Sequence, residues 1–550
     1  MTNESLPWVQ NVVKDPLHFV IVPFLDIIYT GLRLFSEYLI QPWIKTWHRI
    51  NDNRPEGKLS RQLSNANSYD DWCDKAIELD RLLGNDLWKQ QARSKLYDYK
   101  LITSRMDHLY NARQADDVNS MTYLLRGGLL RNFGGISDRK MFTRCHIGTK
   151  QTIEDYMDEV VTQIEYIESS PGLDPQAKMK FFSDTRQGFG RSALVLNGAS
   201  AFALYHIGVV KTLNEQGLLP RIISGNAISA MIASLICIHT DDELPQILQP
   251  DGINLTAFSR QSDKGHFKRR ITRLIKYGYL LDMKVLRKCV RENVGDLTFE
   301  EAYNRSNRIL NISVSTTRTH EVPQLLNYMT APNVLIWSAA CCSTASSGLF
   351  SSCDLLAKDK NGNIVKWNSS DVKWNPWTET SSTESEAPLH ELSELFNVNH
   401  FIVSQASSYA IPFISPLSQL HNDSIWNKFV YMVASEIRHR LYQLDQVHLL
   451  PNIFRGLIEL KISGNVNIVP QLSLSDFNIL FSNPTHASLA YWILHGERST
   501  WPLVSLIRTR CMIELALDEA IIRLKSMNIE KSPVTSVPMR SIKKRARSMH

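Results

Sequence analysis

Several patterns that would assign a chemistry are missing from this chain of 550 residues. Its eight cysteines form no C-x-x-C pair, and no zinc-ligand spacing, P-loop, dinucleotide fingerprint or H-x-x-x-x-D acyltransferase pattern occurs. No cleavable signal peptide is recognisable at the N-terminus. These absences predict reduced thiols in a cytosol-facing protein that holds no metal and no cofactor.

The chain also lacks a large excess of charge of either sign. A formal net charge of +6 is small for this length and does not indicate a nucleic-acid partner. Part of the excess lies near the C-terminus, at Arg540, Lys543, Lys544, Arg545 and Arg547. The length and a hydrophobic content of 43% predict at least one large core.

A long uncharged hydrophobic run of the kind that spans a membrane is also missing. Residues 16–39 are strongly apolar, but Asp26, Arg33 and Glu37 interrupt them and Pro23 would kink a helix. Aromatic side chains of the interfacial type lie within the run and on both sides of it: Trp8, Tyr29, Tyr38, Trp43 and Trp47. Residues 1–50 are therefore predicted to lie in a membrane interface or to form a re-entrant hairpin. A long amphipathic helix that covers the protein's own core is the alternative.

Hydrophobic periodicity divides the rest of the chain. We predict a polar linker at 51–66, a helical region at 67–185, an α/β domain at 190–420 with an exposed loop at 359–388, a helical region at 421–528 and a basic, disordered tail at 529–550. One amphipathic helix face is predicted from Trp72, Ala76, Leu79, Leu82 and Leu83.

Short apolar runs at 194–196, 309–314, 334–337 and 401–403 predict strands. Helical patterns lie between them, as at 202–216. Strands that alternate with helices predict an α/β fold with a mostly parallel sheet flanked by helices.

The segment Ser224–Ala230 reads S-G-N-A-I-S-A. A strand-like run precedes it and an apolar, helix-like run follows, which is the setting of a nucleophile elbow. The position of the nucleophile holds Ala227, which has no hydroxyl. Ser224 and Ser229 are displaced from the tip of the turn, so neither is predicted to be presented as a nucleophile. Ser229 is instead predicted to cap or pack at the start of the helix.

The stretch Leu194–Ala230 resembles the patatin-like phospholipases, and more narrowly the fungal triacylglycerol lipases of lipid droplets. The resemblance covers roughly residues 65–525. Its further motifs are Leu124–Ile136, Gly148–Lys150, Leu395–Gln405, Asn483–Thr485 and Gly496–Pro502.

Patatin-like enzymes use a Ser–Asp dyad and a glycine-rich oxyanion loop. The resemblance places Ala227 at the nucleophile and Thr380 at the base, so both members of the dyad are degenerate. The loop pattern G-G-G-x-x-G falls on Gly198, Ala199, Ser200 and Ala203, with one glycine left. Gly225 and Ser229 take the elbow positions on either side of Ala227. His206 matches a common family residue and is interpreted as structural.

The resemblance together with these losses predicts a pseudoenzyme in neutral-lipid metabolism. It would regulate or stabilise an active lipase relative at the surface of a lipid droplet or of the endoplasmic reticulum. Two alternatives stay open. One is an active triacylglycerol lipase, phospholipase or lysophospholipid acyltransferase that uses non-standard residues. The other is a lipid-binding module that holds an acyl chain.

Overall fold

The computed structural model describes residues 55–198, 201–254, 283–316, 324–345, 353–367, 374–376, 388–406, 464–470 and 485–531, with single residues between 432 and 476. The apolar segment 1–50 and the tail from residue 532 lie outside the described residues, so their interpretation stays a prediction. The chain divides into two compact units, Met1–Gly84 and Asn85–His550.

The described part of the first unit is a pair of packed helices, α4 (Pro55–Ser64) and α5 (Tyr69–Leu82). Residues 51–66, predicted as a linker, therefore contain a helix. Proline favours the first turn of a helix, where its missing N–H is not needed, and Leu59 and Leu63 bury one face.

The buried face of helix α5 is narrower than the sequence predicts. Trp72, Ala76 and Leu79 are buried as expected, but Leu82 and Leu83 are 50% and 46% exposed. Both lie at the C-terminal end of the helix, where Leu83 is already the C-cap. The three- and four-residue spacing of the apolar residues marks the buried face correctly. The helix ends at Leu82, however, and the side chains of Leu82 and Leu83 stay exposed.

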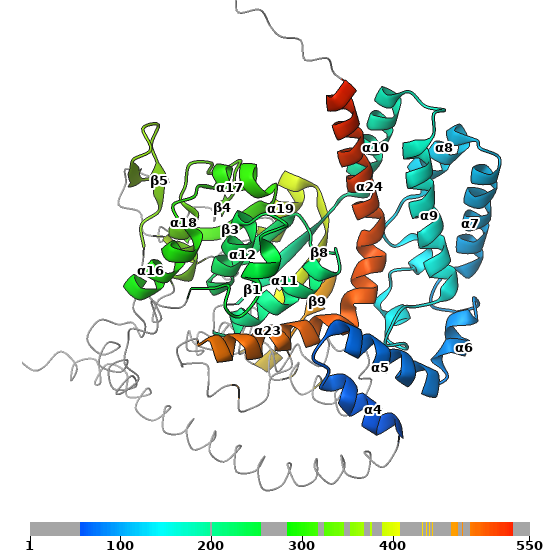
Figure 1. Ribbon diagram of the computed structural model, residues 1–550, viewed down its shortest axis with the longest axis horizontal. Coiled ribbons are helices and arrows are strands. Elements are labelled where there is room, and N and C mark those ends of the chain that lie inside the picture. Colours follow the sequence, from blue (N-terminus) through cyan, green and yellow to red (C-terminus); the bar gives the residue numbers. More distant parts are fainter. Residues whose placement is uncertain are drawn as a thin grey trace, which may run out of the picture. The chain divides into compact units, whose positions relative to one another are not determined.

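The second unit begins with the predicted helical region. It contains α6 (Asn85–Gln90), α7 (Tyr99–Gln114), α8 (Val118–Gly128), the short 3-10 turns η2 (Phe133–Gly135) and η3 (Arg139–Phe142), α9 (Gln151–Ser169) and α10 (Pro175–Phe189). Aspartate side chains at Asp98, Asp117 and Asp174 accept backbone N–H groups and so cap three of these helices. The C-terminal helix α24 (Val504–Lys531) packs along α9 and α10 (Figure 1).

A mostly parallel sheet forms the centre of the second unit, as predicted. Its order is β4-β3-β2-β1-β8-β9, with β7 also paired to β3. The strands are β1 (Arg191–Asn197), β2 (Ile222–Asn226), β3 (Ile309–Thr316), β4 (Gln324–Leu326), β7 (Trp374–Pro376), β8 (Val398–Gln405) and β9 (Val466–Ile468). Only β4 and β7 pair antiparallel among the described strands of this sheet.

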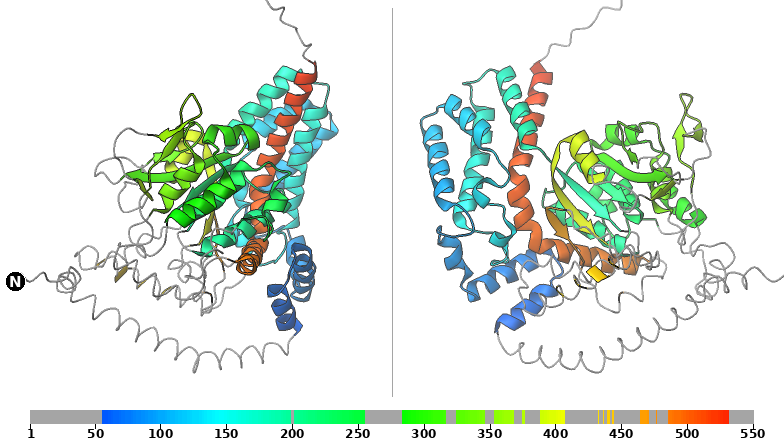
Figure 2. Two further views of the ribbon diagram at one scale, coloured as in Figure 1. Left: turned by 60° about the vertical axis from the view of Figure 1, so that its left-hand side comes forward. Right: turned by 180° about the vertical axis from the view of Figure 1, so that it is seen from behind.

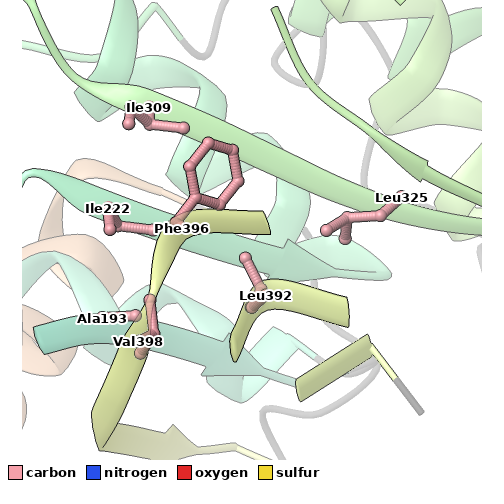
Figure 3. Packing of buried hydrophobic residues seen from close by; sticks show 7 residues of the cluster. All are labelled: Ala193, Ile222, Ile309, Leu325, Leu392, Phe396 and Val398. Atoms are coloured by element: carbon pink, nitrogen blue, oxygen red, sulfur yellow. The ribbon is translucent and has the colours of Figure 1, made fainter. Parts of the chain in front are cut away.

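Helices flank this sheet (Figures 1 and 2). They are η4 (Ala201–Leu204), α11 (Tyr205–Glu215), α12 (Ile228–Ile238), α13 (Leu244–Ile247), α16 (Met283–Val294), α17 (Phe299–Ser306), α18 (Ile336–Thr344), α19 (Pro388–Phe396), α23 (His486–Thr500) and η8 (Trp501–Leu503). Helix α19 places Leu392 and Phe396 against Ala193, Ile222 and Ile309 of three neighbouring strands (Figure 3). Burial of this apolar surface fixes α19 on the sheet.

One local prediction is wrong and another holds in part. Val334–Trp337, expected as a strand, leads into α18, because a short apolar run followed by small residues fits a buried helix equally well. The stretch 359–388, expected as an exposed loop, is exposed over residues 359–366, although β6 (Ile364–Lys366) there pairs with β5 (Leu356–Lys358). It also contains β7, where Trp374 is 3% exposed, and the polar sequence around Trp374 does not indicate this burial.

All eight cysteines are free thiols, as expected. Cys341 and Cys342 are fully buried on α18, and burial raises the pKa of both thiols, which makes them packing residues. In the part of the chain that the structure describes, every helix is too short or too polar to cross a bilayer.

Candidate functional site

The predicted elbow is present with an alanine at its tip. Strand β2 ends at Asn226, helix α12 begins at Ile228, and Ala227 between them has φ 56° and ψ −130°. This conformation is strained for a residue with a Cβ and is characteristic of functional turns. A Cβ at Gly225 would lie 2.6 Å from Cα of Ala230, so the sharp return of the helix requires glycine there. The shape of the elbow is therefore retained without a hydroxyl.

The tip of the elbow is held by Ser343, a serine that no sequence pattern singles out. The N–H of Ala227 donates to Oγ of Ser343 on α18 at 3.0 Å, and this Oγ donates to the carbonyl of Ser313 on β3 at 2.9 Å. Ser343 is fully buried in a run of small residues, and nothing in that run distinguishes it from its neighbours. The hydroxyl proton of Ser343 is donated to the carbonyl of Ser313, and the hydroxyl oxygen accepts from Ala227. Ser343 therefore links α18 to the elbow.

The two serines beside Ala227 do not replace the missing nucleophile. Oγ of Ser229 donates to the carbonyl of Gly198 at 3.1 Å and is fully buried, which agrees with the predicted packing role. Ser224 lies within β2 and is 5% exposed. Among the described residues, no carboxylate is hydrogen-bonded to Ser224, Ser229 or Ser343, so none of these hydroxyls has an acidic partner.

Only part of the predicted oxyanion loop can be placed. Gly198 follows β1, and a Cβ there would lie 2.6 Å from Cβ of Ala406. Ala203, in η4, is fully buried. Ala199, Ser200 and Thr380 lie outside the described residues, so their assignment to the loop and to the base stays a prediction.

His206 joins α11 to the sheet. Its Nδ1 lies 2.8 Å from Oγ of Ser404 on β8. Complete burial lowers the pKa of His206 to about 3, so the ring is neutral at physiological pH. A neutral ring that is fully buried and bonded to a strand matches the structural interpretation of this residue.

A second cluster contains a serine, a histidine and a glutamate that the sequence did not bring together. Ser192 is the second residue of β1, His400 lies on β8 and Glu514 lies on α24. Oγ of Ser192 is 2.5 Å from Oε2 of Glu514 and 3.1 Å from Nδ1 of His400. Arg131 and Arg186 also bind Glu514, at 3.1 and 2.9 Å.

This cluster does not have the order of a catalytic triad. In a triad, the histidine lies between the serine and the acid and takes the serine proton. Here Ser192 donates directly to Glu514, so the tautomer that satisfies the network has Nδ1–H of His400 donating to the serine oxygen. Burial, with Arg131 and Arg510 nearby, holds the pKa of His400 well below its usual range. The cluster also lies at the opposite end of β1 from the elbow, about 16 Å away along the strand.

No cofactor site emerges from the described residues. They bring together no group of three His, Cys, Asp or Glu side chains that could hold a metal ion. Among the described residues of the elbow region, Ala227 offers a methyl group and the nearby Ser229 and Ser343 hydroxyls donate to backbone carbonyls.

The chain belongs to the patatin-like phospholipase family. A family model described as patatin-like phospholipase matches residues 194–376, which include β1, the elbow and α18. A second model, for a domain of unknown function (DUF3336), matches residues 47–187 and so covers most of the helical region.

Relatives with triacylglycerol lipase names match most of the chain. Triacylglycerol lipase ptl1 of Schizosaccharomyces pombe is 34% identical over 90% of this chain and 91% of its own length. Triacylglycerol lipase 4 of Saccharomyces cerevisiae is 36% identical over 86% of this chain and 54% of its own length. Among solved structures, the type III effector ExoU of Pseudomonas aeruginosa matches 62% of this chain and 63% of its own with 12% identity and a TM-score of 0.26.

The strain at Ala227 leads to a stability prediction. Ala227→Gly should raise the free energy of unfolding by about 1 kcal/mol, because φ 56° with ψ −130° is readily adopted only by glycine. Ala230→Gly, inside α12, should lower it by about 1 kcal/mol, since glycine weakens a helix interior. Urea unfolding of both variants measures the difference. A loss of stability in Ala227→Gly would show that the turn is not strained.

Proposed function

We propose that this protein is a catalytically inactive member of its family that regulates or stabilises an active triacylglycerol lipase at a neutral-lipid surface. The observation that carries the proposal is the elbow at Ala227, which keeps the backbone geometry of a nucleophile but ends in a methyl group. An acyl-enzyme needs an oxygen or sulfur nucleophile at this position. The neighbouring hydroxyls donate to carbonyls or lie within a strand, so they offer no substitute.

The choice of neutral lipid follows from the names of the relatives, several of which are triacylglycerol lipases. Attachment to a lipid droplet or to the endoplasmic reticulum follows from the sequence of residues 1–50 and from the basic tail. A droplet has no aqueous far side, so an apolar segment that enters and returns suits it better than a spanning helix. Each Lys or Arg near an anionic surface adds about 1 kcal/mol of attraction.

The test of inactivity uses the purified full-length protein. We expect no hydrolysis of triacylglycerol or lysophospholipid above a mock preparation, and no labelling by a fluorophosphonate probe. The variant Ala227→Ser should also stay unlabelled, because the predicted base position holds Thr380. Unchanged urea unfolding of the variant would show that the serine is presented by a folded elbow.

The same preparations test the alternative of an active lipase, which the names of the relatives favour. Hydrolysis by the wild-type protein would overturn the proposal, and labelling of Ala227→Ser alone would show that a base is still in place. The regulatory half is tested by adding the protein to an active relative on emulsified triacylglycerol. We expect the rate or the lifetime of that enzyme to change, whereas equal amounts of an unrelated protein should have no effect.

A further inference from the structure

Helix α16 carries an unusual concentration of positive charge on its outer face. Its four basic residues are all exposed and follow helical spacing: Lys284, Arg287, Lys288 and Arg291. The opposite face is apolar, with Cys289, Val290 and Val294 buried. The helix is therefore amphipathic, and its exposed face carries four cations and one carboxylate, that of Glu292.

The acidic residues near this face neutralise only part of the charge. Arg291 forms a 2.7 Å ion pair with Asp296, and Lys288 lies 3.8 Å from Glu292 on the next turn. Arg287 makes no ion pair with any carboxylate that the structure describes. An excess of positive charge therefore stays at the surface of α16.

The sequence before α16 adds to this excess. Residues 260–291 contain eleven lysines and arginines and two aspartates, an excess of nine positive charges. Because the whole chain carries +6, the remainder of the protein is net negative. Apart from the C-terminal tail, the positive charge is thus concentrated in the stretch of 32 residues that ends in α16.

The fold attaches both ends of residues 255–282 to the same helix. At one end, the N–H of Asn254 donates to Oδ1 of Asn293 on α16 at 2.8 Å, and Nδ2 of Asn293 donates back to the carbonyl of Asn254 at 2.9 Å. At the other end, Met283 begins α16. The exposed face of α16 is the described part of this basic stretch and is fixed to the protein core.

Helix α16 also lies next to the elements that form the elbow. It packs against α18, which carries Ser343, and against α12, which begins directly after Ala227 (Figure 1). A partner surface that binds α16 would therefore contact the protein on the side where α16 packs against α12 and α18. This placement distinguishes α16 from the basic tail at the C-terminus.

We propose that the exposed face of α16, at Lys284, Arg287, Lys288 and Arg291, docks on an anionic phospholipid surface. The proposal deepens the proposed function, since it rests on attachment of the protein to lipid. The occupant follows from charge complementarity: an extended, diffuse basic face suits a layer of anionic headgroups. The helix stays folded on the core, and its side chains contact headgroups without entering the apolar layer.

The test compares binding of the full-length protein to two kinds of vesicle, phosphatidylcholine alone and phosphatidylcholine mixed with phosphatidylserine. The ratio of the two affinities isolates the electrostatic contribution, because an apolar anchor contributes to both. The double variant Arg287→Gln/Lys288→Gln should lower this ratio by about tenfold to thirtyfold, since each removed charge weakens the attraction by about fivefold. High salt should lower the wild-type ratio as well.

The matched control removes the same charge elsewhere. Lys95→Gln/Lys100→Gln changes two exposed lysines, one before α7 and one in its first turn, and should alter the ratio by about twofold or less. An unchanged ratio in the α16 variant would overturn the proposal and leave an acidic protein as the partner of this face. An equal loss in the control would also overturn it, because binding would then depend only on net charge. Hydrolysis measured on the same vesicles tests the proposed function separately.

Discussion

Replacing Glu514 by glutamine is expected to lower the free energy of unfolding by about 3–5 kcal/mol, the largest effect that we predict for a single charge. Glu514 is 6% exposed and accepts from Arg131, Arg186 and both the N–H and Oγ of Ser192. The variant keeps the shape of the side chain but removes this carboxylate from the buried Arg186 and the partly buried Arg131. Urea unfolding of the full-length protein measures the change.

The control for this prediction lies on the same helix. Glu519 is exposed, so Glu519→Gln should change the stability by less than about 0.5 kcal/mol. Similar changes in the free energy of unfolding for Glu514→Gln and Glu519→Gln would mean that the network around Glu514 adds nothing to stability. A loss confined to Glu514→Gln would show that α24 is held to the start of β1 by buried charge.

A methyl group at Gly208 is expected to destabilise the protein by about 3 kcal/mol or to prevent its folding. Gly208 of α11 faces α23, and a Cβ there would lie 1.9 Å from the carbonyl oxygen of Ile493. On the facing helix, a Cβ at Gly496 would lie 2.1 Å from the carbonyl oxygen of Tyr205. The two backbones are too close for any side chain, so Gly208→Ala must push the helices apart.

A helical glycine without neighbours serves as the comparison. Gly188 of α10 has open space around its Cβ position, so Gly188→Ala should leave the stability unchanged or raise it by about 0.5–1 kcal/mol. Thermal unfolding and the soluble yield of both variants give the measurement. Equal behaviour of the two variants would contradict the close crossing of α11 and α23.

Both predictions concern the scaffold of the second unit. The crossing of α11 with α23 depends on Gly208 and Gly496, and the elbow backbone depends on Gly225. The tip of the elbow is Ala227, which has no hydroxyl. The turn at Ala227 has a φ of 56° and its N–H donates to Ser343, so the elbow is a well-defined turn without a hydroxyl at its tip.

The amino-acid sequence by itself determined the elements around the elbow. The pattern before and after Ala227 predicted β2 and α12 with small errors at their ends, because a strand, a sharp turn and an apolar helix are local features. It also identified the family, since motifs such as Leu124–Ile136 and Gly496–Pro502 are contiguous. The absence of a hydroxyl at residue 227 needed no structure at all.

Only the tertiary structure decided which distant residues meet. Ser343 reaches the elbow from 116 residues away, and Glu514 reaches Ser192 from 322 residues away. Neither contact leaves a local pattern, because each side chain is selected by its neighbours in space. Neighbours in space also decide that the short apolar run at Val334–Trp337 leads into helix α18. They likewise decide that Trp374, whose neighbours in sequence are polar, belongs to the sheet.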